Sequence, residues 1–288
     1  MTSSSTVAVS GAGGFVGRNL VAALDSRGHD VVAWHSSDAD LTDPKETLDL
    51  MARDRPGAIF HLAAVGARPG EADTPEAVAA NVAMAVNLVS AAEPGTLLIM
   101  AGTMAEYGKA GALAESDLCT PRTAYAIGKY VAGTFAMTYG PERGLVVRVA
   151  RLFGAYGPGE HPDRLFPSLT RELRAGRPVP LSDGLQRRDF VHVSDVSEAL
   201  IRIAGVGSDQ SFVVNVGTGQ AVNVGDVCRW VAESVGADES LLRFDARERS
   251  PGDADVLEAD TALLRDLIGW VPPQRLRPGV AQDLFAGD

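Results

Sequence analysis

The chain has 288 residues, about twice the usual domain length of roughly 150 residues, which predicts one large domain or two fused domains. Hydrophobic residues make up 45% of it and charged residues 22%, values that are typical of globular proteins and exclude a disordered or fibrous chain. Its formal net charge of −11 repels phosphate backbones and anionic lipid, so we expect neither nucleic acid nor a membrane as a main partner.

The cysteines and the N-terminal residues indicate the compartment. Cys119 and Cys228 lie far apart and have no metal-ligand spacing, which predicts no metal site and a reducing environment. The residues before the first glycine lack the basic and apolar stretches of a signal or transit peptide, and no window reaches about 18 consecutive apolar residues. We therefore expect a cytoplasmic protein.

Short apolar runs alternate with longer helical patterns along the first half of the chain. The predicted buried strands cover residues 6–10, 30–34, 58–62, 96–100 and 145–149, and the predicted helices cover 15–27, 44–53, 74–93 and 121–140. This alternation requires right-handed crossovers and gives an α/β fold, a doubly wound parallel Rossmann sheet with helices on both faces.

The pattern changes after the fifth strand. Short strands at residues 212–216 and 241–244, short helices and frequent prolines predict a smaller α/β lobe. We therefore predict a dinucleotide-binding Rossmann domain in residues 1–153. Residues 154–288 are predicted to form mainly a substrate-binding lobe, with some segments returning to the Rossmann core.

The first strand leads directly into a glycine-rich loop with the spacing GxxGxxG, formed by Gly11, Gly14 and Gly17. Glycines there allow a tight turn and a close approach of the backbone to a pyrophosphate, and the following helix N-terminus adds positive potential. Such a loop alone can be an ordinary strand–helix turn, but after the first strand of an alternating chain it favours a dinucleotide site. The predicted site also includes the opening of the helix, with Phe15, Val16 and Arg18.

The end of the second strand decides which nicotinamide cofactor binds, because a carboxylate there recognises the ribose 2′-hydroxyl. The sequence has His35, Ser36 and Ser37 at this point and no acid. These residues can donate hydrogen bonds to a 2′-phosphate and Arg18 can add charge, which predicts NADP(H) in preference to NAD(H). The alternative is that Asp38 reaches back to serve as the ribose acid and that Arg18 is a solvated helix residue.

A tyrosine and a lysine share one face of the helix predicted over residues 121–140. Tyr125 and Lys129 are four residues apart, the spacing of neighbours on a helix surface. A cationic neighbour stabilises a phenolate and lowers the pKa of the phenol, and Thr103, after the strand at 96–100, can add a hydroxyl. Such a pair alone is usually a solvated surface pair, but with the glycine loop and Thr103 it indicates a catalytic centre.

Together these segments resemble the extended short-chain dehydrogenase/reductases, the NAD-dependent epimerase/dehydratase family that acts on nucleotide sugars. The matching segments occur in order: GAGGFVG at 11–17, FHLAA at 60–64, Asn81, TMAEYG at 103–108, YAIGK at 125–129, RLFGAYGPGE at 151–160, RRDFVHVSD at 187–195, NVGTG at 215–219 and LIGWVP at 267–272. The resemblance covers nearly the whole chain, and it specifies the family far better than the reaction.

The resemblance implies a role for each predicted catalytic residue. Tyr125 is implied to be the general acid/base, Lys129 to hold the nicotinamide ribose and lower the pKa of the tyrosine, and Thr103 to orient the substrate carbonyl. It further implies a homodimer and a cofactor site that includes Asp40, Leu41, Leu62, Ala63 and Ala64.

The resemblance also implies a sugar nucleotide as the small-molecule substrate. Met104 and Ala105 are implied to contact it, and Arg188 and Arg249 to bind its diphosphate; the alternative for either arginine is a surface ion pair. Two positions depart from the family pattern: Gly154 stands where asparagine is frequent, and Arg249 has one residue more before Gly-Asp than the pattern has.

The two residues that follow Thr103 limit the reactions that the chain can catalyse. By the resemblance, 4,6-dehydratases carry Asp-Glu there and epimerase/reductases of the fucose-synthase type carry a cysteine two residues on, whereas Met104 and Ala105 cannot transfer a proton. We therefore expect an NADPH-dependent ketoreductase of deoxysugar biosynthesis that reduces a nucleotide-linked 4-keto-6-deoxyhexose, with Tyr125 as the proton donor.

The same sequence features allow three alternative functions to be compared with this one. A nucleotide-sugar 4-epimerase with tightly bound NAD and a reductase of a non-sugar, polyketide-like ketone are the alternatives within enzymes. A redox-sensing binding module is disfavoured, because a sensor does not need the set of Thr103, Tyr125 and Lys129.

Overall fold

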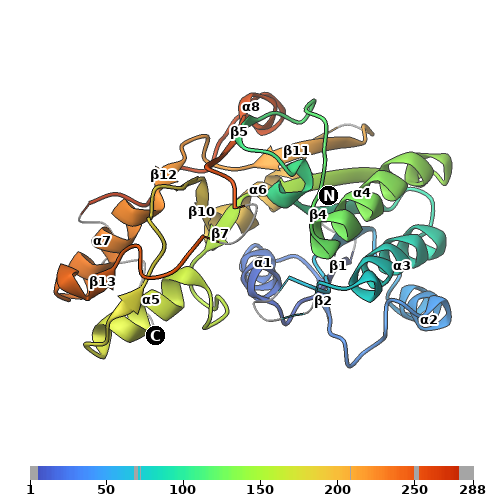
Figure 1. The fold of residues 1–288 in the computed structure, drawn as a ribbon. Helices are drawn as coiled ribbons and strands as arrows, with labels where there is room; N and C mark the ends of the chain where they lie inside the picture. Colours follow the sequence, from blue (N-terminus) through green and yellow to red (C-terminus); the bar gives the residue numbers. More distant parts are fainter. Residues whose placement is uncertain (1–5, 68–70, 72, 208, 250–252, 279–288) are drawn as a thin grey trace.

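The computed structural model describes residues 6–67, 71, 73–207, 209–249 and 253–278 (Figure 1). Its centre is a six-stranded parallel sheet in the order β2-β1-β3-β4-β6-β11. The strands are β1 (Val7–Ser10), β2 (Val31–Trp34), β3 (Ala58–His61), β4 (Leu97–Thr103), β6 (Val146–Leu152) and β11 (Phe212–Val216). The predicted doubly wound α/β fold is confirmed.

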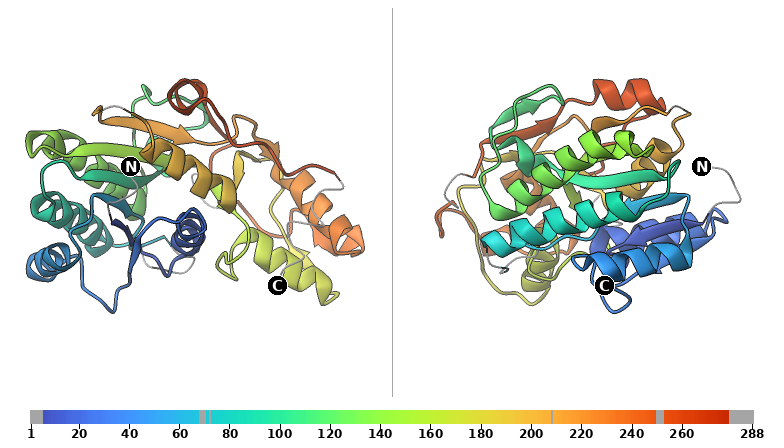
Figure 2. Two further views of the ribbon diagram at one scale, coloured as in Figure 1. Left: turned by 180° about the vertical axis from the view of Figure 1, so that it is seen from behind. Right: turned by 90° about the vertical axis from the view of Figure 1, so that its right-hand side faces the viewer.

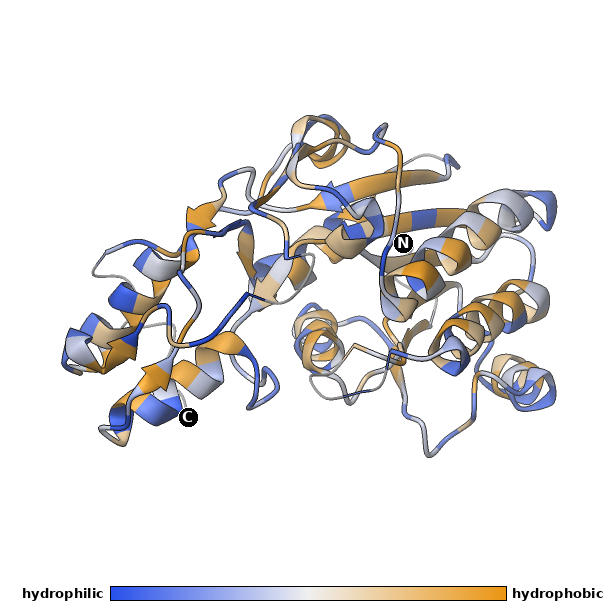
Figure 3. Ribbon diagram, in the orientation of Figure 1, coloured by the Kyte–Doolittle hydropathy of each residue, from blue (hydrophilic) through white to orange (hydrophobic). Residues whose placement is uncertain are grey.

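Helices cover both faces of this sheet. One face carries α1 (Phe15–Asp25), α6 (Val193–Ala204) and α8 (Ala262–Ile268), and the other carries α2 (Pro44–Asp54), α3 (Pro75–Ala91) and α4 (Ala124–Glu142), as Figures 1 and 2 show. Because both faces are covered, every residue of β1 and β3 is buried, the pattern of a central parallel strand. Figure 3 shows hydrophobic residues along these strands and on α3 and α4.

Local sequence signals fix where three of these helices begin. The Asp43 side chain accepts the Lys45 and Glu46 N–H groups before α2, and Thr74 caps α3 ahead of a proline. Thr123 caps α4 by accepting the Ala126 N–H. Side-chain oxygens in this position satisfy amides that have no partner within the helix, so each cap sets the first turn of its helix.

The strands β4 and β6 extend three residues beyond their predicted ends, to Thr103 and Leu152. The extra residues pair with one another across the two strands, with Gly102 beside Arg151 and Thr103 beside Leu152. The two predicted strands end where their apolar runs end, whereas the backbone pairing of β4 with β6 continues through Arg151 and Thr103.

A second lobe is built from the later part of the chain. It contains α5 (Leu165–Arg174), α7 (Val224–Ser234), the pair β8 (Val179–Pro180) and β13 (Leu242–Arg243), and the 3-10 helix η2 (Glu239–Leu241), around a core that includes Phe166 and Val227. Figures 1 and 2 show α5 and α7 away from α2, α3 and α4.

Two smaller sheets lie between these parts. One pairs β7 (Gly154–Tyr156) with β10 (Phe190–His192), and the other has the order β12 (Val222–Asn223), β9 (Arg187–Arg188), β14 (Val256–Ala259), β5 (Gly111–Leu113). The strand predicted at 212–216 lies in the main sheet as β11, parallel to β6, and α6 packs on α1. These are segments of the later chain that return to the Rossmann core.

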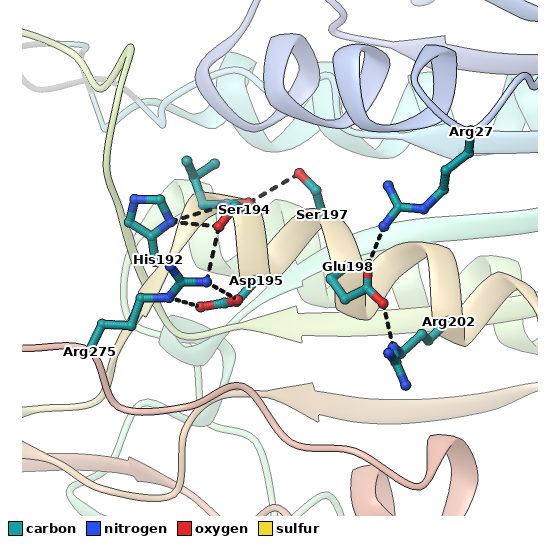
Figure 4. Close-up of polar contacts among 9 residues, drawn as sticks. Arg27, His192, Ser194, Asp195, Ser197, Glu198, Arg202 and Arg275 are labelled. Atoms are coloured by element: carbon teal, nitrogen blue, oxygen red, sulfur yellow. Dashed lines mark hydrogen bonds and ion pairs between the residues drawn. The ribbon is translucent and has the colours of Figure 1, made fainter. Parts of the chain in front are cut away.

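Ion pairs tie α6 to segments far away in the sequence (Figure 4). Asp195 accepts two hydrogen bonds of 2.6 Å from Arg275. Glu198 is paired with Arg202 on its own helix and with Arg27, just after α1. These contacts hold α6, and with it β10, against α1 and the C-terminal segment.

None of the helices in the described part of the chain is both long and apolar enough to span a membrane.

Candidate active site

The loop after β1 is packed too tightly to carry side chains. A Cβ atom on Gly17 would lie 2.1 Å from the carbonyl oxygen of Gly11, and one on Gly11 would lie 2.7 Å from the backbone nitrogen of Ala63. The helix α1 then begins at Phe15 with no side-chain cap and no acidic residue in its first turn, so its N-terminal amides are available to an anion. This loop fits the pyrophosphate of a dinucleotide, which it would hold together with Phe15 and Val16.

The end of β3 lies beside the glycine loop. The N–H of Leu62 donates to the carbonyl oxygen of Ser10 at 3.2 Å, which brings residues 62–64 next to the loop. His61 is 1% exposed, and its Nδ1 lies 2.8 Å from the hydroxyl of Ser10. Burial and the charge of Lys129 lower the pKa of His61 to about 3, so this buried imidazole is neutral.

An acid lies at the end of β2, three residues beyond the position that the family pattern uses. The Oδ2 atom of Asp38 accepts the backbone N–H of His35 at 2.7 Å. The ring of His35 lies over the glycine loop, since a Cβ atom on Gly13 would be 3.2 Å from its Nδ1. Ser36 and Ser37 are exposed beside it. The structure therefore brings His35 to the glycine loop and a carboxylate to the same strand end.

Arg18 lies away from the end of β2. Its Nη2 donates to the carbonyl oxygen of Gly159 at 2.8 Å, so α1 is joined to the loop after β7 by this side chain. The sequence predicts that Arg18 acts together with His35, Ser36 and Ser37 on the cofactor. In the structure the side chain of Arg18 is instead hydrogen-bonded to the loop after β7.

The turn that follows β2 is held by its own hydrogen bonds. Asp40 Oδ1 accepts the backbone N–H and the hydroxyl of Thr42, each at 2.8 Å, and these bonds lower the pKa of Asp40. The carbonyl oxygen of Leu41 accepts a hydrogen bond of 3.0 Å from Asn87 on α3. Asp40 and Leu41 thus occupy a fixed turn between β2 and α2.

Thr103, Tyr125 and Lys129 meet at the carboxyl end of the sheet. Thr103 is the last residue of β4. The start of α4 places Tyr125 in its first turn, with Lys129 one turn later on the same face. Lys129 is 4% exposed, and the Thr103 side chain is near enough to the phenol of Tyr125 to lower its pKa. The structure therefore groups the three residues that the sequence predicted as catalytic.

Burial has the largest effect on the pKa values of Tyr125 and Lys129. Burial and the charge of Glu106 raise the pKa of Tyr125 to about 12, against the opposing effects of Thr103 and Arg164. Burial lowers the pKa of Lys129 to about 8, and Glu106 opposes that fall. Lys129, expected to lower the pKa of Tyr125, is not among the groups that set it. The phenol is thus protonated at neutral pH, the form that can donate a proton.

Asn81 fixes the loop that packs on Tyr125. Its side chain accepts the N–H of Val65 at 3.1 Å and donates to the carbonyl oxygens of Val65 and Ala77 at 2.8 and 2.7 Å. A Cβ atom on Gly66 would lie 3.5 Å from Cβ of Tyr125. Asn81 therefore holds residues 65–66 against Tyr125.

Met104 and Ala105 follow Thr103 directly, in the 3-10 helix η1 (Met104–Tyr107). Neither side chain carries a titratable group, and the contact to substrate predicted for these two residues stays a prediction. Within the described residues no cluster of three or more histidine, cysteine or acidic side chains is arranged to hold a metal ion.

The two arginines predicted to bind a diphosphate both have carboxylate partners. Arg188 is 9% exposed and is paired with Asp253. Arg249 is paired with Asp183 at 2.8 Å and with Asp255 at 2.7 Å, and it lines a pocket of about 400 Å³. Pro251 and Gly252 of the predicted motif lie outside the described residues.

Two glutamates whose pKa or partners are set by burial were not among the predicted site residues. Glu106 lies in η1 and forms a capping box with Thr103, the residue before this helix. The Thr-x-x-Glu spacing of a capping box is a sequence signal that could have identified Glu106. Glu160 follows β7, and burial raises its pKa to about 7 against the effect of Arg164. Nothing in the sequence around Glu160 indicates that its carboxyl group is buried.

Comparison with known proteins gives a consistent result. Residues 7–217 match the family described as NAD dependent epimerase/dehydratase. The chain is 30% identical to a UDP-glucose 4-epimerase of Mycolicibacterium smegmatis over 95% of this chain and 96% of the relative. It is 28% identical to a dTDP-6-deoxy-L-talose 4-dehydrogenase (NAD(P)(+)) of Kitasatospora kifunensis over 98% and 95% of the two chains.

A solved structure is similar over the same extent. The structure of MoeE5 in complex with UDP-glucuronic acid and NAD has a TM-score of 0.83 and 32% sequence identity, and the match covers 96% of this chain and 97% of that one.

Proposed function

The chain belongs to the NAD dependent epimerase/dehydratase family and is an NAD(P)-dependent enzyme, and we propose that it reduces the keto group of a nucleotide-linked 4-keto-6-deoxyhexose. The observation that carries the proposal is the grouping of Thr103, Tyr125 and Lys129 beside a loop that fits a dinucleotide. The names of the relatives support a sugar nucleotide, because they include an enzyme of UDP-glucose and one of a dTDP-deoxysugar.

The residues of this site supply one proton and hold the substrate. When bound, the nicotinamide cofactor supplies the hydride to the carbonyl carbon. Thr103 holds the carbonyl oxygen by a hydrogen bond, and the protonated phenol of Tyr125 gives its proton to that oxygen as the alcohol forms. We assign Lys129 to the ribose of the nicotinamide cofactor, which its ammonium group would hold by a hydrogen bond.

A panel of 4-keto-6-deoxy sugar nucleotides, incubated with the protein and NADPH, tests this function. We expect at least one member to be reduced, with loss of the absorbance of the reduced nicotinamide. If no member of the panel oxidises NADPH, the ketoreductase proposal is wrong.

A second candidate is a nucleotide-sugar 4-epimerase with retained NAD. The carboxylate of Asp38 at the end of β2 favours it, because an acid there recognises an unphosphorylated ribose. The UDP-glucose 4-epimerase among the relatives favours it too. This enzyme would interconvert UDP-glucose and its 4-epimer with no added cofactor, a result that the reductase does not give.

The cofactor preference is a separate prediction. His35, Ser36 and Ser37 offer donors to a 2′-phosphate, and Oδ2 of Asp38 is already bonded to the backbone of His35. We expect NADPH to bind at least about tenfold tighter than NADH, which corresponds to about 1.4 kcal/mol. Titration of both cofactors measures this, with Asp38→Asn as the matched variant. Tighter NADH binding that is lost in Asp38→Asn would assign Asp38 to the ribose and favour the epimerase.

We further propose that the chain forms a homodimer through α4. Ile127, Val131 and Tyr139 lie on one stripe of this helix and are 36%, 40% and 52% exposed, an apolar surface that a second copy would cover. Val131→Glu should convert a dimer into a monomer in size-exclusion chromatography with light scattering. Leu185→Glu, at an exposed leucine of the other lobe, is the control. A native protein that is monomeric would contradict this proposal.

A further inference from the structure

A buried glutamate lies beside the catalytic group and takes no part in the proton transfer described above. Glu106 is 2% exposed, and an ionised carboxylate in such a place is unfavourable unless it is paired and hydrogen-bonded. Its short helix η1 joins the end of β4 to the rest of the chain and packs against α4, the helix that carries Tyr125 and Lys129.

Both carboxylate oxygens of Glu106 are engaged. Oε1 accepts the backbone N–H of Thr103 at 2.8 Å. Oε2 accepts Nε of Arg151 at 2.8 Å, and Arg151 is itself 6% exposed. The carboxylate thus bridges the end of β4, where the catalytic threonine lies, and the neighbouring strand β6.

The arginine is held as firmly as the glutamate. Its guanidinium lies over the ring of Tyr107, 4.7 Å from the centroid, and the Tyr107 hydroxyl donates to Asn215 at 2.7 Å. A Cβ atom on Gly102 would lie 2.7 Å from Oε1 of Glu106, so the carboxylate occupies space that is open only because residue 102 is a glycine. Hydrogen bonds from β4 and β6 fix the position of both carboxylate oxygens.

That position sets the charge around Lys129. Glu106 on η1 acts on the charge of Lys129, and Lys129 in turn acts on His61 at the end of β3. Tyr125 lies one turn before Lys129 on α4. His61 is neutral, and Tyr125 is protonated at neutral pH. Glu106 is thus the carboxylate that opposes the loss of the Lys129 ammonium on burial. Arg151 and Cys119 are the other titratable groups near Glu106, and Arg164 acts on Tyr125.

We propose that Glu106 is a positioning residue of the catalytic centre: its carboxylate, clamped by Arg151, fixes the backbone of Thr103 and places a buried negative charge against the helix that carries Lys129. The proposal rests on the proposed function, because that function assigns catalysis to Thr103, Tyr125 and Lys129. The experiment that tests the role of Glu106 measures the titration of Lys129 directly and needs no substrate. The role of Glu106 and the proposed reaction can therefore be disproved independently of each other.

The scarcity of lysine makes Lys129 directly observable. The chain has three lysines, Lys45, Lys109 and Lys129, so the full-length protein labelled with carbon-13 at lysine Cε gives three side-chain signals in NMR spectra. Lys45→Arg and Lys109→Arg variants assign them by elimination. In the native protein we expect the Lys129 signal to titrate near pH 8.

The decisive variant is Glu106→Gln, which keeps the size and an acceptor for Thr103 but removes the charge. Because the carboxylate raises the pKa of Lys129, its removal should lower the Lys129 midpoint by about one pH unit or more. Glu106→Asp, which keeps the charge, should restore most of the native midpoint. Glu115→Gln is the matched control, since Glu115 bonds to Asn215 of the same network but does not act on Lys129.

Glu106→Gln leaves the guanidinium of Arg151 buried without its partner, which can prevent folding. The double variant Glu106→Gln/Arg151→Met removes both charges, and it should show the same lowered Lys129 midpoint. An unchanged Lys129 midpoint in whichever of these variants folds, or an equal shift in Glu115→Gln, would overturn the proposal. A lowered midpoint in a protein that reduces no 4-keto sugar nucleotide would support the role of Glu106 and reject only the proposed reaction.

Discussion

Replacing Tyr125 with phenylalanine should lower turnover by about 10²–10⁴-fold, the usual contribution of a general acid. The substitution removes the hydroxyl that gives its proton to the carbonyl oxygen and keeps the ring and the Cβ atom that lies against the loop at Gly66. Because burial holds the pKa of Tyr125 at about 12, the native phenol carries its proton throughout the neutral range. The measurement is the turnover number with NADPH and the active member of the sugar-nucleotide panel.

Two controls separate this effect from a structural one. Cofactor affinity and the thermal unfolding midpoint of Tyr125→Phe should stay close to native values, and Tyr130→Phe on the same helix should leave turnover unchanged. Near-native turnover in Tyr125→Phe would assign the proton to water or to the substrate itself.

The second large effect is expected at Arg188. A chain with a formal net charge of −11 has no general attraction for an anionic ligand, so a sugar nucleotide must be bound by a few placed cations. Loss of a charge-assisted hydrogen bond costs about 1.5–3 kcal/mol, so Arg188→Ala should weaken the binding of a nucleoside diphosphate by roughly ten- to a hundredfold. Titration calorimetry with UDP and with dTDP measures this affinity.

The partner of Arg188 supplies a matched variant with the opposite effect. Asp253 is paired with Arg188 and competes with a diphosphate for it, so Asp253→Asn should tighten UDP binding. Affinity for NADPH should change in neither variant. If nucleoside diphosphates do not bind the native protein, or if Arg188→Ala binds them equally well, the reductase of a non-sugar ketone becomes the better hypothesis.

The parts of the fold that the sequence predicted are those with a local cause. Apolar runs located all six strands of the main sheet, and the helices predicted over 74–93 and 121–140 begin one and three residues before the observed starts of α3 and α4. The positions of Thr103, Tyr125 and Lys129 follow from topology, because the carboxyl ends of parallel strands meet at one edge. Their roles remain predictions.

The features that were missed depend on contacts between distant segments. The strand at 212–216 joins the main sheet because β6 has a free edge for it, a pairing across about 60 residues that no local pattern encodes. Arg18 bonds to Gly159 and Glu106 to Arg151, each across a gap set by the tertiary fold. Asp38 is the alternative ribose acid that the sequence predicts; its Oδ2 atom accepts the backbone N–H of His35, and its role at the ribose stays a prediction.

The measurement that tests the central claim most directly follows the hydrogen that is transferred. The protein is incubated with a 4-keto-6-deoxy sugar nucleotide and NADPH that carries deuterium in both positions at C4 of the nicotinamide, and the product is examined by NMR and mass spectrometry. We predict that deuterium from the cofactor appears at C4 of the sugar, with the rate strongly reduced in Tyr125→Phe. A sugar that is converted without deuterium at C4 would contradict the account, because its hydrogen would then come from a retained cofactor or from solvent.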